Sequence, residues 1–473
     1  MSTFGALSTA YSGLVAAQQA LDVAGQNVAN AGTDGYTRQR VDQAAVGPSG
    51  PEGLAWAGGP RAGEGVAVQR IERLGNALLD ASVRSTTAAS GYAAQRSAAY
   101  QGIEAALQEP GSGGVSAQLQ SFWAAWHDVA NQPGEPAPAS VLLDSGRQLA
   151  ARLSAGYAAL SGQWSAARAD AATMVTAVND AARQIAALNV RIRSAVAAGG
   201  SANELVDARS RLTETVASLA GGTVREHADG TVTVSVGGNA LVDGDAARAI
   251  ELAGGTTMGA APGPSLVWAD RPSVPASLDG GSLAGALSVL APANAQGTGG
   301  PIAEAAAGYS ALAATLAAAV NTVHAAGQTT GGATGLAFFA LDPSVPAAEG
   351  LSVVPTDASG VAAGAAGAGA YDGATADAIA QLGAANGSPD SQWAGFVTAL
   401  GSSSKATQQE ESLAATAASS AKTAQTSSAS VSLDEENMGL VAGQHAYQAA
   451  ARVMSAIDQA LDTLINHTGT VGL

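Results

Sequence analysis

Both ends of the chain carry apolar residues at a spacing of seven. Near the start the repeat comprises Leu7, Leu14, Leu21 and Val28, with Tyr11 and Gln18 between them. Near the finish it comprises Leu440, Tyr447, Met454 and Leu461, interleaved with Gly443, Ala450, Ile457 and Leu464. A heptad repeat keeps one stripe on the same side of a slightly supercoiled helix, so each segment is predicted to lie along another helix. A seam at both termini is typical of a subunit that stacks into a tube or fibre.

The region between the seams is predicted to be mostly helical. Its strongest pattern lies within residues 171–195, where apolar residues alternate at three and four: Met174, Val178, Ala181, Ile185, Leu188, Ile192 and Ala195. If this helix runs from about 165 to 198, it is roughly 50 Å long at 1.5 Å per residue, which suits a rod-like bundle. Another helix is predicted to bury one face, made of Leu119, Phe122, Trp123, Trp126 and Val129. Further helices are expected over about 2–28, 74–107 and 302–324, from near Val141, and from 390 to about 427.

Strand patterns occur in two places. Residues 36–41 and 66–71 flank a Pro- and Gly-rich segment, 47–65, which is predicted to be an ordered loop or short hairpin. The composition changes again at Gly221-Gly222. There, two alternating runs flank Asp229-Gly230, the best hairpin signal in the chain. β-Rich character is predicted to persist to about Pro275.

The closing helix has a predicted start at residues 432–435, Ser-Leu-Asp-Glu. This pattern fits a capping box, in which Ser432 accepts the backbone N–H of Glu435 and the Glu435 side chain reaches back. The neighbouring acidic residues also lie at the positive end of the helix dipole, which favours them.

These patterns predict an α+β, multidomain protein that is mainly α with β-rich insertions. We expect paired N- and C-terminal coiled-coil-like helices, a long helical bundle and an outer β domain. Residues 1–40 plus 431–473 would form a terminal helical axial core. Residues 41–221 plus 276–430 would form the rod-like bundle, with a loop and β-hairpin region near 339–373. Residues 222–275 would form the outer β-rich insertion.

Composition narrows the function. The net charge of −17 argues against binding to nucleic acid or to anionic membrane surfaces, because both need clustered Lys and Arg. The longest apolar run, 311–320, is about half of what spans a bilayer, so no membrane insertion is expected. Cysteine is absent, which excludes disulfides and thiol catalysis. The first basic residue is Arg38, so export, if it occurs, is expected to use a route without a cleavable signal.

Chemical motifs are scarce. Residues 402–405, Ser-Ser-Ser-Lys, fit the Ser-x-x-Lys pattern of serine acyl enzymes, but the motifs that accompany it are missing. The histidines are scattered, with no pair at metal-ligand spacing. The sequence therefore predicts no catalytic residue, no cofactor and no metal site.

Two segments resemble a known family. Residues 27–36 read NVANAGTDGY, which is similar to the N-terminal signature of the axial proteins of the bacterial flagellum, namely its rod, hook and hook-associated proteins. The continuation at residues 37–39 and the C-terminal run VSLDEE at 431–436 look most like the hook-associated members that join hook to filament. Hook and rod proteins usually have Ala in place of Asp434. Residues 113–131, 185–213 and 280–283 also resemble the junction type.

The resemblance implies a structural subunit of the hook–filament junction, exported by the flagellar type III route and located outside the cell. Its implied partners are copies of itself in a ring of a tubular assembly, the hook protein, a second junction protein, and an export chaperone with the export apparatus. It implies terminal helices that form the innermost layer. The predicted assembly residues are Leu7, Tyr11, Leu14, Leu21, Val28, Asn30, Gly35, Tyr36, Leu440, Tyr447, Met454, Ile457, Leu461 and Leu464.

Three alternatives remain open from the sequence. The terminal heptads could pair within one monomer as an ordinary coiled coil. The protein could be a hook or distal rod protein, against which residues 37–39, residues 433–436 and the chain length weigh. An enzyme or lytic factor that uses the middle region would need titratable residues gathered in a pocket, and the charged content of 12% offers little for one.

Overall fold

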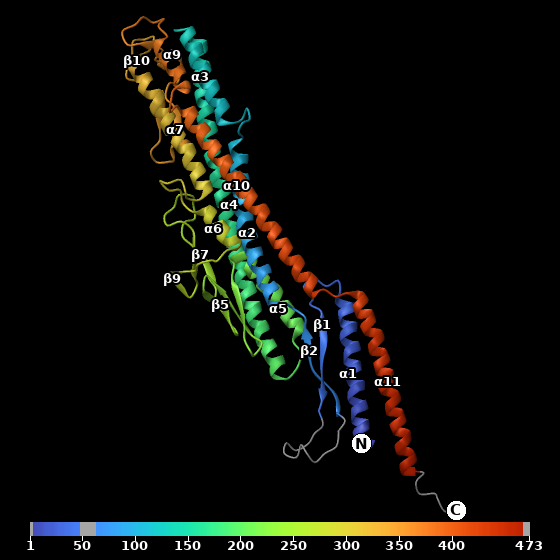
Figure 1. Ribbon diagram of the computed structural model, residues 1–473. Coiled ribbons are helices and arrows are strands. Elements are labelled where there is room, and N and C mark those ends of the chain that lie inside the picture. The colour runs from blue at the N-terminus through green and yellow to red at the C-terminus, as the bar shows by residue number, and fades with distance from the viewer. Residues whose placement is uncertain (1–2, 48–62, 467–473) are drawn as a thin grey trace, which may run out of the picture.

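The computed structural model describes residues 3–47 and 63–466. Figure 1 shows an elongated molecule in which a long helical bundle continues through a bend into a thinner part formed by the two chain ends. Helices dominate, and the strands form small antiparallel sheets. The predicted class, mainly α with β-rich insertions, is therefore confirmed.

The thinner part, which we call the terminal unit, contains both chain ends. Its elements are α1 (Thr3–Asn30), β1 (Gln39–Val46), β2 (Gly65–Arg73) and α11 (Leu433–Asn466). α1 and α11 lie side by side and run in opposite directions (Figure 1). The β1–β2 hairpin packs against another face of α1, although the sequence grouped residues from 41 onward with the bundle. Most of the segment 47–65, predicted as a loop or hairpin, lies outside the described residues.

The bundle consists of long helices that surround a common apolar core. They are α2 (Ala77–Leu107), α3 (Val115–Asn131), α4 (Pro136–Ala197), α5 (Asn203–Ala220), α6 (Gly281–Leu290), α7 (Pro301–Ala326) and α10 (Pro389–Ala429). α4 has 62 residues and is about 90 Å long. It exceeds the predicted helix because Pro136 starts it at a position that needs no N–H donor. Its early turns are buried through Leu142, Leu149, Leu153 and Leu160.

Aromatic side chains form the centre of the bundle core near its far end. Phe122 and Trp126 of α3 both pack against Phe338, with ring centroids 5.8 and 5.1 Å apart. The five residues predicted on the buried face of this helix are all buried, which confirms that prediction. Such clusters add edge-to-face attraction to the burial of a large apolar area.

α7 is long and apolar enough to cross a membrane by length and composition alone. Half of its most apolar window is buried inside the bundle, as in the core helix of a water-soluble fold. Tyr309, Leu312, Leu316 and Val320 form its inner face. Its hydropathy therefore follows from packing in the bundle core.

Two small sheets lie along one side of α4 (Figure 1). The first contains β3 (Thr223–Glu226), β4 (Val232–Val236), β5 (Asn239–Asp243) and β6 (Ala246–Ala247). The second contains β7 (Ile250–Ala253), β8 (Ser265–Trp268) and β9 (Arg271–Pro275). The hairpin predicted around Asp229-Gly230 is confirmed as β3–β4. Both sheets contribute buried residues to the bundle core, so the region 222–275 is packed against the bundle.

Asparagines on α4 attach these sheets to the helix. The Asn189 amide donates to the Val232 carbonyl oxygen at 2.9 Å and accepts the Val232 N–H at 3.1 Å. Asn179 binds the backbone of Ile250 in the same way, at 2.9 and 3.0 Å. An asparagine amide offers a donor and an acceptor side by side, so it can replace a neighbouring strand.

The far end of the bundle is rich in loops, as predicted for residues near 339–373. Its short elements are β10 (Gly327–Gln328), β11 (Phe339–Leu341), α8 (Ala347–Gly350), β12 (Leu351–Val353), η1 (Ala358–Gly360), β13 (Gly364–Ala365), α9 (Ala374–Ala380) and η2 (Gln381–Ala384). β10 pairs with β13 and β11 pairs with β12, in both cases antiparallel.

Candidate assembly core

The predicted N-terminal seam faces α11 of the same chain. A Cβ added at Gly443 would lie 3.0 Å from Leu21 Cδ2 and 3.9 Å from the Ala17 carbonyl oxygen. Residues on this side of α1 follow one another at intervals of three or four positions. The stripe so defined comprises Leu7, Ala10, Leu14, Ala17, Leu21, Ala24 and Val28, all of them buried or half-buried. The two heptad helices therefore pair within one chain. This pairing is the ordinary coiled coil within one monomer that the sequence left open as an alternative.

Tyr11 and Gln18 do not belong to this seam, contrary to the sequence analysis. Both are exposed, and the Tyr11 side chain keeps 59% of its surface accessible. Ala10 and Ala17, one residue earlier, hold the intervening positions and are buried. Either spacing fits a heptad, and the smaller side chain allows the helices to approach more closely. Tyr11 lies beside the seam, largely exposed, and stays a predicted contact with another subunit.

The matching stripe on α11 is only half-covered. Gly443 is buried and the apolar residues of the stripe are half-buried, namely Leu440, Ala450, Met454, Ile457 and Leu461. Tyr447 and Leu464 share the spacing but are 38% and 58% exposed. The predicted residues thus lie along one face, which α1 covers incompletely.

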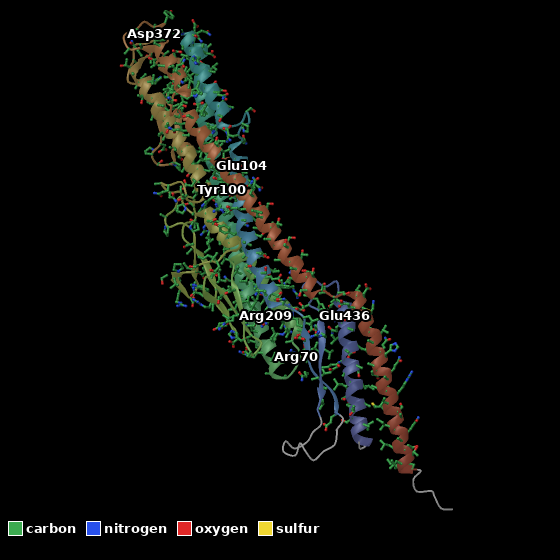
Figure 2. All side chains as sticks on the ribbon, in the orientation of Figure 1. Arg70, Tyr100, Glu104, Arg209, Asp372 and Glu436 are labelled. Atoms are coloured by element: carbon green, nitrogen blue, oxygen red, sulfur yellow. The ribbon has the colours of Figure 1, made fainter. Side chains whose placement is uncertain are left out.

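The terminal unit joins the bundle at a polar junction that we call the elbow. It comprises residues 27–39, the start of α11 and the first turns of α5, and Figure 2 labels Glu436 and Arg209 near it. Its centre is Asn27, which is 1% exposed. The Asn27 amide donates to the Gln39 carbonyl oxygen at 2.9 Å and to Glu436 Oε2 at 3.0 Å. Its oxygen accepts the Gln39 N–H at 3.0 Å and the Tyr36 hydroxyl at 2.9 Å.

Asn27 therefore makes all four hydrogen bonds that its amide can form. These bonds connect the end of α1 with the start of β1 and the start of α11. Replacing any partner would leave a buried polar group unpaired, which typically costs about 1–3 kcal/mol. The signature segment thus has a structural role that its composition alone did not reveal.

Arg38 connects the same elements through charge. Its Nε donates to Glu436 Oε1 at 2.7 Å and its Nη1 donates to Glu435 Oε2 at 2.6 Å. Although partial burial opposes it, these two carboxylates raise the pKa of Arg38. The backbone N–H of Glu435 donates to Ser432 Oγ at 3.4 Å, as the capping box requires. The Glu435 side chain binds Arg38 instead of reaching back to its own helix end.

α5 supplies the other half of the elbow. Asp207, which is 3% exposed, accepts the Thr37 N–H at 3.1 Å and the Arg73 Nε at 2.5 Å. Glu204 Oε1 accepts from Gln39 Nε2 at 3.1 Å. α5 therefore fixes the segment after the signature on the bundle side.

Asn203, at the first turn of α5, completes this contact. Its amide donates to Gln39 Oε1 at 2.9 Å and to the Ile71 carbonyl oxygen at 3.1 Å. Residues 185–213 resemble the junction type in sequence, but their pattern alone predicts no site there. The acidic and amide side chains of this segment could have indicated the contact with the elbow, because buried polar residues need hydrogen-bond partners.

The remaining predicted residues of the signature shape the turn. Asn30 accepts the Thr33 hydroxyl at 3.3 Å. Gly35 has a φ of +71°, in the left-handed region that favours glycine, and a Cβ there would lie 2.8 Å from the Arg211 side chain, which would have to shift. Burial, with the nearby carboxylates of Glu204, Asp207 and Glu436, raises the pKa of Tyr36 to about 12. The Tyr36 hydroxyl thus stays protonated and donates to Asn27.

The chemical motifs of the sequence are not assembled into a site. Ser402, the serine of the Ser-x-x-Lys motif, is exposed and its hydroxyl donates to the Thr398 carbonyl oxygen at 3.0 Å, and Lys405 is exposed as well. Among the residues in 3–47 and 63–466, no group of three or more His, Asp or Glu side chains could hold a metal ion.

Comparison with known proteins gives this architecture a context. A family model described as "Flagellar hook-associated protein FlgK helical domain" matches residues 100–339, half of the chain. "Flagella basal body rod protein" matches residues 7–37, and "Flagellar basal body rod FlgEFG protein C-terminal" matches residues 426–467. The latter two matches coincide with α1 and its signature and with α11.

Individual relatives point to the same family as the family models. Flagellar hook-associated protein 1 of Bacillus subtilis is 29% identical over 511 residues, covering 100% of this chain and 99% of that protein. The Escherichia coli protein of the same name is 28% identical over 245 residues, covering 51% of this chain and 44% of that protein. The fold is similar to that of the flagellar hook junction protein FlgK from Burkholderia pseudomallei, with a TM-score of 0.64, 14% identity, and coverage of 73% of this chain and 100% of that one.

The matches to the two terminal segments, which here form paired helices joined to a helical bundle through the elbow, define an axial protein of the bacterial flagellum. The match to the helical domain separates it from hook and rod proteins. The chain belongs to the family of flagellar hook-associated protein FlgK, the structural protein of the hook–filament junction. It is thus a structural flagellar protein that associates with other flagellar components.

Proposed function

We propose that this protein forms a ring at the junction between hook and filament, outside the cell. In that ring each subunit contacts copies of itself, the hook protein on one side and a second junction protein on the other. The terminal unit is the proposed assembly core, with the bundle outside it and residues 222–275 facing outward. The observation that carries the proposal is that both terminal helices present a further heptad stripe beyond the one used within the chain.

On α11 this further stripe directly adjoins the seam with α1. It comprises small, exposed residues at the same spacing: Gly439, Ala442, Ala446, Ala449, Val453, Ala456 and Ala460. Small residues at three-four spacing let a neighbouring helix pack closely.

On α1 a corresponding stripe faces neither α11 nor the hairpin. It comprises exposed or half-buried residues: Ser8, Tyr11, Val15, Gln18, Asp22, Gly25 and Ala29. Tyr11 is the largest side chain of the stripe and would supply the anchor that the small residues of α11 lack. We propose that this stripe meets α11 of the next subunit.

The third face of α11 is mainly polar, with Gln444, Gln448, Arg452, Ser455, Gln459 and Asp462 exposed in a row. The two charges on this face have opposite signs and the other side chains are uncharged, so the face offers an unfolded passing chain no field of a single sign. We assign this face to the lumen of the tube.

Before assembly, we propose that an export chaperone holds the apolar stripe of α11 while the export apparatus carries the subunit out. The stripe consists of residues that α1 covers only in part, so it can be offered to another partner. We propose no enzymatic step for the protein.

The test replaces Met454 and Leu461 by Asp. Burying each such side chain is worth roughly 1.5–3 kcal/mol, so two buried charges should abolish junction assembly and chaperone capture. The bundle should still melt cooperatively.

Electron microscopy of flagella that carry gold-labelled wild-type protein should locate it at the hook boundary. Label along the whole filament, or double-variant cells with firmly attached filaments, would overturn the proposal.

A further inference from the structure

The loop between η2 and α10 contains Asn386-Gly387, the one place in the chain where glycine follows asparagine. Both residues are exposed, whereas Ser388 after them is buried. The Ser388 N–H donates to the Ala385 carbonyl oxygen at 3.0 Å, which closes a β-turn with Asn386 and Gly387 at its centre. Glycine suits this position because it adopts a positive φ, here +73°, without strain.

Neither reactive group of this pair is held by a hydrogen bond to a described residue. This is true of the side-chain amide of Asn386 and of the backbone N–H of Gly387. No atom would lie within 4 Å of a Cβ built on Gly387, so the space beside its backbone is open. The side-chain amide of Asn386 can therefore turn toward the backbone nitrogen of the next residue.

No other asparagine of the chain combines these features, since none is followed by glycine. Asn294 is the closest comparison, because it is also exposed and lies in a loop. Its Oδ1 accepts the N–H of Gln296 at 3.0 Å and the N–H of Thr298 at 3.1 Å, which hold the side chain in place. Alanine follows it, and the alanine Cβ crowds the backbone nitrogen that glycine leaves open.

We propose that Asn386 is a site of spontaneous deamidation. A base in the solvent removes the Gly387 amide proton, and the nitrogen attacks Cγ of Asn386. The new C–N bond closes a succinimide ring, the bond from Cγ to the side-chain nitrogen breaks, and ammonia leaves with the proton returned by the base. Because the two groups belong to adjacent residues, this attack is intramolecular.

Solvent water completes the reaction. It adds to either carbonyl of the ring and breaks that C–N bond, which leaves a carboxylate. Opening at one carbonyl gives aspartate, and opening at the other gives isoaspartate, in which the main chain runs through the former side-chain methylene. In total one water is consumed and one ammonia is released, and no enzyme or cofactor takes part.

The product carries a new carboxylate close to the start of α10. Ser388 caps this helix, since its Oγ accepts the Ser391 N–H at 3.1 Å. The helix dipole favours a negative charge near this end, so the aspartate product should leave α10 intact. The isoaspartate product lengthens the connection from η2 to α10 by a methylene group. Since the reaction proceeds without another protein, the modified fraction records the time since a subunit was made.

The test incubates the purified full-length protein at neutral pH in water labelled with a heavy oxygen isotope. Samples taken over time are digested in ordinary water, so the label marks only rings that opened before digestion. Mass spectrometry then identifies the peptides, with a fragmentation method that separates aspartate from isoaspartate. Asn294 is the internal control. Asn386→Gln is the matched variant, because it keeps the amide and the charge but must close a larger ring, which forms more slowly.

We expect the peptide with Asn386 to gain the mass of the amide-to-acid exchange with one labelled oxygen, in aspartate and isoaspartate forms. The peptide with Asn294 should stay unchanged, and Asn386→Gln should lose the product. An amide that persists at Asn386, or conversion of Asn294 at the same rate, would overturn the inference. Conversion to aspartate alone would also overturn it, because direct hydrolysis without the ring gives no isoaspartate.

Discussion

The bundle and the terminal unit stabilise their helices in different ways. In the bundle, large side chains such as Trp126, Trp164 and Tyr309 are fully buried, and α4 has apolar neighbours along its whole length. In the terminal unit, α11 has only Glu436 and Gly443 buried, and its contact with α1 relies on small or half-covered residues. Apolar burial is the main stabilising term in folding. We therefore expect the bundle to be stable alone, and we propose that neighbouring subunits complete the terminal unit.

The polar elbow connects the bundle and the terminal unit. It orders the terminal unit through directional bonds to Asn27, Arg38 and Asp207, which contribute less than apolar burial but fix geometry. The elbow thus fixes the orientation of the terminal unit relative to the bundle, although the helices of that unit are only weakly stabilised.

The largest effect should come from the bundle core. Phe122→Ala should lower the free energy of unfolding by about 3–5 kcal/mol, because it leaves a cavity among packed rings. Tyr11→Ala, an aromatic truncation in the terminal unit, should change it by less than about 0.5 kcal/mol. Urea denaturation of both variants measures this contrast, and equal losses would show that the two regions do not differ as described.

A smaller effect is expected at the elbow. Asn27→Ala leaves the backbone groups of Gln39 and one Glu436 oxygen without a partner, at about 1–3 kcal/mol for each stranded group. Limited proteolysis should then cut within α1 and α11 faster, while the melting temperature of the bundle stays unchanged. Asn30→Ala, which removes only local bonds at the end of α1, serves as the control. A lowered bundle melting temperature would contradict the separation of the two regions.

Bundle stability should also depend on pH through His324. This ring is fully buried, its Nδ1 lies 2.8 Å from the Leu336 carbonyl oxygen, and its Nε2 accepts the Ala362 N–H at 3.0 Å. Burial lowers the pKa of His324. The unfolded chain, whose histidines titrate near about 6.5, therefore takes up the proton first, and stability falls as pH drops below that value.

Urea unfolding at pH 7 and at pH 5 measures this loss. In His324→Gln, which cannot titrate, the difference between the two pH values should be smaller than in the unsubstituted protein. An unchanged difference would remove His324 as the cause.

The smallest effect on the monomer is expected on the outer stripe of α11. Ala446→Gln lies on an exposed position and should leave the free energy of unfolding within about 0.5 kcal/mol of its original value. Assembly into flagella should nevertheless decline, because the longer side chain blocks close helix approach. Gln448→Ala on the polar face, a change of similar size, should assemble normally. Normal assembly of Ala446→Gln would exclude this stripe from the subunit contact.

Much of this fold could be predicted from the sequence, because periodicity reports which face of a helix is buried. The aromatic face of α3, the hairpin at Asp229-Gly230 and the break before α11 were all predicted from local patterns and are confirmed. The seam of α1 was misassigned at Tyr11 because two heptad registers fit an alanine-rich helix equally well.

The elbow could not be predicted, because it depends on contacts between residues distant in sequence. Asn27 and Glu436 are 409 residues apart, and Thr37 and Asp207 are 170 apart. Nothing in the local pattern of either partner specifies the other. The family resemblance pointed to both segments without indicating that they bind each other. The assembly residues themselves stay predictions, since the contacts they would make belong to neighbouring subunits.

Hydrogen exchange on the isolated subunit tests the central contrast most directly. The account predicts weak amide protection from Leu7 to Val28 and from Leu440 to Leu464, strong protection along α4, and a rise in the two terminal segments in isolated flagella. Protection of the terminal helices in the monomer as strong as that of α4 would contradict it, because the terminal unit would then be complete without neighbours.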